Sequence, residues 1–131
     1  MNRESITEEE VYRFILLQID TVPHLEALLL LWRNRPRLFT EQDLARQLFV
    51  DVGKAHEIAR DLDRSGLITI NGGDPQVYCY ETKDIRINAL MEALAALYKR
   101  ELVSISQLIH SKAPSAARDF ARAFKFTKDR D

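Results

Sequence analysis

The sequence is nearly without cysteine. Cys79 is the one cysteine in 131 residues, so the chain can form no internal disulfide and holds no cluster of thiolates for zinc. A disulfide-bonded secreted scaffold and a cysteine-rich zinc module are therefore excluded. Because the chain cannot rely on disulfides, we expect it in the reducing cytoplasm.

Long hydrophobic runs are also lacking. The longest apolar stretch, Ala27 to Trp32, is far shorter than the ~20 residues that cross a bilayer. The first ten residues carry four acids and have neither the cationic start nor the apolar run of a signal peptide. We therefore expect no membrane span and no secretory signal.

No excess of charge of one sign is present either. Nineteen basic residues face twenty acidic ones, for a formal net charge of -1, which excludes a uniformly basic coat for nucleic acid. With 46% hydrophobic and 30% charged residues, the composition is that of a soluble globular protein. The length matches one ordinary domain of roughly 100–150 residues, with little room for two.

Apolar side chains at helical spacing predict four helices in the first half of the chain. Capping residues precede the first, third and fourth, and Pro23 suits the first turn of the second. The first and third begin at threonines followed by acids, which favour the first turn of a helix, and the fourth ends at a glycine. The second is apolar on most faces, which indicates a buried central helix. The expected ranges are Thr7 to Asp20, Pro23 to Asn34, Thr40 to Phe49, and Asp51 to Arg64.

The second half begins with two strand-like segments. Leu67 to Ile70 and Val77 to Tyr80 flank Asn71 to Pro75, a stretch of turn-forming residues, and together they predict a β-hairpin. From Asp84 to Ser111 there is no glycine or proline, and apolar residues recur at three- and four-residue steps, which predicts one helix of roughly seven turns. Ala116 to Phe126 suggests a short last helix.

This order of elements resembles a winged helix-turn-helix. The resemblance rests on Thr40-Glu41-Gln42-Asp43-Leu44-Ala45-Arg46-Gln47-Leu48, on Ala55 to Leu62 and on Arg64-Ser65-Gly66-Leu67-Ile68. These segments are similar to the T-x-x-(D/E)-L-A-x-x-L … L-x-x-x-G-L-I pattern of bacterial winged-helix regulators such as the MarR and PadR families. The resemblance covers about Val22 to Thr82.

The fold that this resemblance implies is mainly α with a small β-hairpin wing, flanked by an N-terminal helix and a long C-terminal helix. We accordingly expect residues 1–82 to form the N-terminal helix and winged helix-turn-helix domain. Residues 83–131 are expected to form the long helix and the short terminal helix, as a dimerisation region.

The function that the resemblance implies is that of a DNA-binding transcriptional regulator. In such proteins the second helix of the pair enters the major groove, and the wing touches the neighbouring groove or backbone. The wing tip here is Asn71 to Gln76. The candidate DNA-binding residues are Lys54, His56, Arg60, Arg64, Arg46 and Arg37.

The distribution of charge keeps an alternative function open. Residues 20–82 hold seven basic and ten acidic side chains, whereas residues 83–131 hold ten and six. Affinity for DNA comes mostly from lysines and arginines that neutralise phosphates, so an acidic winged helix departs from the regulators it resembles. The alternative is a protein–protein interaction module that binds a basic protein partner without contacting DNA.

The long C-terminal helix is expected to form a homodimer, because its apolar stripe is broader than one small domain requires and two-fold dimers match paired DNA half-sites. The alternative is that this helix folds back on residues 7–20 and completes a monomeric core. The candidate interface residues are Leu90, Leu94, Leu97, Tyr98, Leu102, Ile105 and Ile109.

Catalytic and metal-binding motifs are not evident. His24, His56, His110 and Cys79 lie in four separate predicted elements, without the short ligand spacings of a metal site. Cys79 lies between two tyrosines in a strand, where a small buried hydrophobe is the expected role. The sequence therefore predicts a protein that is not an enzyme and has no metal site and no cofactor.

Overall fold

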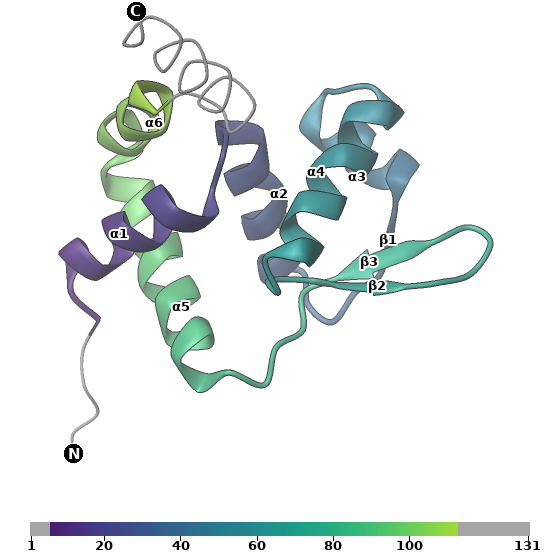
Figure 1. The fold of residues 1–131 in the computed structure, drawn as a ribbon, viewed down its shortest axis with the longest axis horizontal. Coiled ribbons are helices and arrows are strands. Elements are labelled where there is room, and N and C mark those ends of the chain that lie inside the picture. The colour runs from purple at the N-terminus through teal and green to yellow at the C-terminus, as the bar shows by residue number, and fades with distance from the viewer. Residues whose placement is uncertain (1–5, 113–131) are drawn as a thin grey trace, which may run out of the picture.

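The computed structural model describes residues 6–112. It shows a helical protein with a small antiparallel sheet at one side (Figure 1). In chain order the elements are α1 (Glu8–Gln18), α2 (Val22–Arg33), β1 (Phe39–Thr40), α3 (Glu41–Leu48), α4 (Val52–Arg64), β2 (Thr69–Asn71), β3 (Val77–Cys79), α5 (Ile85–Arg100) and α6 (Leu102–Ser111). The short helix expected at residues 116–126 lies outside the described residues.

The predicted starts of the helices are confirmed by their caps. Thr7 and Thr40 each form a capping box, in which the threonine hydroxyl accepts from the third residue of the helix and that residue's carboxylate accepts from the threonine N–H. Asp51 caps α4 by accepting from the Lys54 N–H at 2.7 Å. The local sequence alone therefore determines where α1, α3 and α4 begin.

The end of α4 is closed by Gly66, whose φ of +77° lies in the left-handed region that glycine adopts most easily. The next N–H, of Leu67, donates to the carbonyl of Leu62 at 3.0 Å. Leu67 and Ile68 are buried but belong to this closing turn, so β2 begins at Thr69, later than the sequence predicts.

The prediction of one continuous helix from Asp84 to Ser111 is wrong. Glu101 has φ -121° and ψ 40°, which ends α5 at Arg100, and α6 begins at Leu102. The break lets α6 fold back against α1 and α2, where Ile105 and Ile109 are buried. Tertiary packing supplies most helix stability in proteins, so this burial outweighs an unbroken helical pattern.

The sheet has one strand more than the hairpin that the sequence predicts. Its order is β1-β3-β2, both pairs are antiparallel, and Phe39 of β1 lies opposite Tyr78 of β3. A strand of two residues is too short to show the alternation of apolar and polar residues by which strands are predicted from sequence. By pairing with β3, β1 ties the start of α3 to the wing.

The centre of the molecule is α2, as its apolar sequence predicts. Figure 1 shows α1, α5 and α6 on one side of α2, and α3, α4 and the sheet on the other. The buried side chains of α2 contact both groups, which joins them through one continuous core. Within residues 6–112 no single helix is long and apolar enough to span a membrane; α1 and α2 reach that length only together, across a bend of 114°.

Candidate nucleic-acid interface

The helix pair α3 and α4 forms the geometric centre of the candidate interface. Leu44 and Ala45 of α3 are buried against Ala55, Ile58 and Ala59 of α4. The small alanine side chains let the two helices pack closely. The first turn of α4 remains exposed beyond this contact.

The turn between the two helices presents apolar side chains to solvent. Phe49 adopts the left-handed conformation (φ 58°, ψ 45°), and 93% of its surface is exposed. Val52, at the first position of α4, is 41% exposed. A left-handed conformation is strained for a residue other than glycine, and here it directs a large aromatic ring away from the core.

Three of the candidate basic residues already have acidic partners. The Lys54 Nζ lies 3.7 Å from Glu57, the Arg46 guanidinium lies 2.8 Å from Asp43, and the Arg64 guanidinium lies 3.0 Å from Asp61. These pairs are three residues apart on exposed helix faces, so each contributes little to stability. Their effect is to lower the positive charge that the helix pair presents.

Arg60 and Arg37 have different surroundings. Among the described residues Arg60 forms no ion pair, and its side chain is exposed on α4. The Arg37 guanidinium lies over the ring of Phe39, 4.5 Å from the ring centre, in a cation–π contact. Among the lysine and arginine candidates, Arg60 is therefore the one that forms neither an ion pair nor a cation–π contact in the described part of the chain.

The side chain of His56 is held by a contact within the protein. Its Nδ1 contacts the Glu41 carboxylate, which also accepts a hydrogen bond of 2.6 Å from the Tyr78 hydroxyl. These hydrogen bonds, first that of Tyr78 and then that of His56, hold the pKa of Glu41 below its ordinary value. Burial and the nearby carboxylate raise the pKa of Tyr78 far above its usual range. One carboxylate thus links α3, α4 and β3.

The wing contributes a polar pocket of about 260 Å³ beside the start of α3. Its charged members are Glu41 and Asp74, so this hollow favours cations over phosphate oxygens. The lining residues are Glu41, Gln42, Gly73, Asp74, Pro75 and Gln76.

Most of the predicted dimer-interface residues lie inside the chain's own core. The five that are buried face α1 and α2 across α5 and α6, so no partner subunit can reach them in this arrangement. Tyr98 is partly buried, and its hydroxyl donates to Glu26 at 3.5 Å, whereas Leu102 is half exposed. The buried five are Leu90, Leu94, Leu97, Ile105 and Ile109.

Other apolar side chains on α1 and α6 are exposed instead. Leu17 is 73% exposed and Val103 is 67% exposed, while Leu16 is half exposed. Val11 and Ile15, four residues apart, face the core, and Leu16 and Leu17 fall off that stripe. The helical period therefore predicts that Leu16 and Leu17 face outward from α1.

The comparisons with known proteins bear on the fold. No family model and no curated protein matches the sequence. Solved structures do match, although at low identity.

MepR, a transcription regulator of the Staphylococcus aureus multidrug efflux pump MepA, superposes with a TM-score of 0.55 and 15% identity over 94% of this chain and 89% of that chain. A variant of MepR bound to an oligodeoxyribonucleotide gives 0.54 and 15%, over 95% and 89%. A MarR family transcriptional regulator from Silicibacter pomeroyi gives 0.52 and 19%, over 94% and 85%. The predicted fold is confirmed: the chain has the winged helix-turn-helix fold, mainly α with a small sheet, that these regulators share.

Proposed function

We propose that this chain is a DNA-binding transcriptional regulator that acts as a homodimer in the cytoplasm. The single observation that carries the proposal is the helix pair α3–α4, with the start of α4 and Arg60 exposed beside the wing. The similarity to solved regulators, one of them bound to an oligodeoxyribonucleotide, supports it. The proposal includes no catalytic step.

In this proposal α4 lies in the major groove and Arg60 reads a base edge or a phosphate. Arg46, Lys54 and Arg64 exchange their carboxylate partners for phosphates on binding. That exchange costs part of the gain from each phosphate contact, because the abandoned carboxylate remains close to the DNA. We therefore expect DNA binding that is weak at high salt and depends strongly on the correct sequence.

The proposed dimer uses the exposed apolar side chains of α1 and α6, rather than the predicted residues that the chain buries in its own core. Leu17 and Val103 form the centre of this interface. Of the interface residues predicted from the sequence, Leu102 is the one that the proposed dimer keeps, because it is half exposed. Burying these side chains between two subunits removes apolar surface from water, which favours association. The assignment of residues 83–131 as the dimerisation region is thereby extended to α1.

The experiment is a binding series with a labelled duplex from the chain's own upstream region, measured by fluorescence anisotropy at several salt concentrations. We expect retention at low salt, a steep fall in affinity with rising salt, and weaker binding to a scrambled duplex of equal length. No binding to either duplex at low salt would exclude a DNA-binding function.

One observation favours the second candidate, a protein-interaction module for a basic protein. Phe49 and Val52 form an exposed apolar pair at the α3–α4 turn, within a net acidic segment. An exposed aromatic side chain within an acidic segment suits a partner surface that is basic with an apolar pocket. Affinity capture from the native cell should then recover one stoichiometric protein, and Phe49→Ala should release it.

A further inference from the structure

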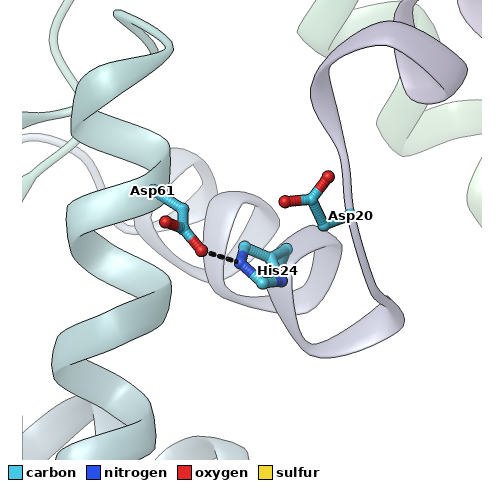
Figure 2. A group of neighbouring side chains, drawn as sticks. All are labelled: Asp20, His24 and Asp61. Carbon is cyan, nitrogen blue, oxygen red and sulfur yellow. Dashed lines mark hydrogen bonds and ion pairs between the residues drawn. The ribbon is translucent and has the colours of Figure 1, made fainter. Parts of the chain in front are cut away.

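Three side chains with metal-ligating atoms converge where the α1–α2 linker meets α4. Asp20 lies in the linker, His24 in the first turn of α2 and Asp61 in the last turn of α4 (Figure 2). One ligand atom from each lies within 4.8 Å of the other two. His24 Nε2 and Asp61 Oδ2 are already 2.8 Å apart.

The imidazole of His24 is held in place from its other side. Only 4% of the residue is exposed, and its Nδ1 lies 2.6 Å from Oγ1 of Thr21, the residue that caps α2. Histidines that ligate metals almost always have such an oxygen partner on the second ring nitrogen, which orients the ring. The sequence alone does not identify Thr21 as a partner of the His24 ring, because a threonine at the start of a helix is already explained as a cap.

The hydroxyl of Thr21 lets the imidazole present Nε2 without its proton. In the neutral ring one nitrogen carries the proton and the other accepts. If Nδ1 carries it, the Nδ1–H donates to Thr21 Oγ1, and the lone pair of Nε2 faces Asp20 and Asp61. A cation between these groups then replaces the hydrogen bond that Nε2 otherwise donates to Asp61.

We propose that Asp20, His24 and Asp61 bind a divalent transition-metal ion of the Zn²⁺ type. One imidazole nitrogen and two carboxylate oxygens form a three-ligand set, which leaves a fourth position for water. Oxygen and nitrogen ligands about 2.1 Å from a tetrahedral ion lie about 3.4 Å from one another. The ligand atoms now lie within 4.8 Å of one another, so they must move closer when the ion binds.

The carboxylate ligands at the site also suit a cation. Two carboxylates face one imidazole, and Arg64 contacts Asp61 through its other oxygen, Oδ1, at 3.0 Å. Oδ2 of Asp61 remains directed toward His24, so Arg64 does not block it. Mg²⁺ and Ca²⁺ are poorer candidates because they prefer sites built from oxygen ligands alone.

The bound ion would join α4 to the start of α2 through Asp61. It would also neutralise one of the carboxylates on the helix that carries Lys54 and Arg60. The metal site can be tested without DNA, because all three of its ligands belong to this chain.

The test is a titration of the full chain with Co²⁺, followed by the visible absorption of the ion. We expect one equivalent to bind, and both Asp20→Asn and Asp61→Asn to lower the affinity about 10-fold or more. Asp63→Asn is the matched control, because Asp63 is an exposed aspartate on the same helix, outside the cluster. Unchanged Co²⁺ affinity in either cluster variant would overturn the three-ligand site, as would failure of the wild type to bind one equivalent.

A melting experiment provides a second readout that does not require spectral bands. An ion that binds only the folded chain raises its melting temperature, so a given Zn²⁺ concentration should stabilise the wild type and Asp63→Asn more than Asp20→Asn. Asp20 lies in a linker rather than in the core, which makes this variant the safer one to fold. Equal stabilisation of all three proteins would exclude the site.

Discussion

Glu41 joins three elements of the winged helix through one carboxylate. It accepts from the Tyr78 hydroxyl at 2.6 Å and contacts the His56 ring, and these hydrogen bonds hold its pKa below the ordinary 4.5. The contact holds the ring of His56, a predicted DNA-contacting residue, against α3, although 43% of its side chain stays exposed. A pH-dependent contribution to stability follows.

The pKa of Glu41 is lower in the folded state than in the unfolded state. The contribution of Glu41 to stability is therefore fully present above its unfolded-state pKa and is lost as the pH falls through its folded-state pKa. We expect Glu41→Gln to be less stable than the wild type by about 1 kcal/mol at neutral pH. This difference should shrink once the pH falls below 4.5. Urea unfolding at several pH values measures it.

The matched control for Glu41→Gln is Glu9→Gln. Glu9 is exposed on α1, where it forms a salt bridge to Arg13 at 3.5 Å, so the control removes the same charge without touching the α3–α4–β3 junction. Parallel pH profiles for Glu41→Gln and the wild type would contradict the role of Glu41.

Arg60 is the residue on which direct DNA recognition depends most. Arg60→Ala should weaken binding to the specific duplex by about 1–3 kcal/mol if the guanidinium reads a base edge. Arg13→Ala removes an exposed arginine from α1, away from the helix pair, and should change little. Anisotropy titrations of both variants at one salt concentration give the comparison, and equal affinities would exclude Arg60 from the interface.

At the scale of elements, the end of α4 depends on the backbone conformation of a single glycine. Gly66 has φ +77°, and a Cβ added there meets nothing within 4 Å. The cost of a side chain is therefore conformational rather than steric. We expect Gly66→Ala to lower the free energy of unfolding by about 1–2 kcal/mol.

Gly72→Ala is a suitable control for this prediction. Gly72 also has open space around it, but its φ is not in the left-handed region. Urea unfolding of the two variants separates backbone strain from the general effect of replacing glycine. Equal effects at both positions would mean that the left-handed turn contributes nothing specific.

The break between α5 and α6 shows the limit of periodicity. Residues 84–111 keep a helical spacing of apolar residues without glycine or proline, so no local signal predicts a break at Glu101. The break places Ile105 and Ile109 against the core formed with α1 and α2. Local preferences permit either arrangement, and burial chooses between them.

At the scale of the whole molecule, the exposed apolar side chains of α1 and α6 predict self-association. Leu17→Glu together with Val103→Glu should convert the dimer into a monomer, because the added carboxylates would be buried without partners at the interface. Light scattering after size exclusion measures the mass. The control is Leu38→Glu, which adds a carboxylate at a half-exposed leucine of the α2–β1 connection.

A wild-type chain that remains monomeric at high concentration would contradict the proposed dimer and remove the argument from paired DNA half-sites. A dimer that persists in the double variant would place the interface elsewhere on the surface.

The sequence by itself determined the features that depend on a few neighbouring residues. Thr7, Thr40 and Asp51 cap helices because their side chains accept from N–H groups three residues ahead. Gly66 ends α4 because few other residues adopt its φ readily. Together with the apolar period, these signals predicted the order of elements, and the resemblance to bacterial winged-helix regulators implied the fold.

Only the tertiary structure decided which residues far apart in the sequence meet. It buried the predicted interface leucines inside one chain, paired β1 with β3, and connected His56 to Glu41. It also brought Asp61 to Asp20 and His24, a group that no spacing in the sequence reveals. The physical reason is that capping and periodicity act within a few residues, whereas burial and charge pairing act between elements whose packing no local pattern encodes.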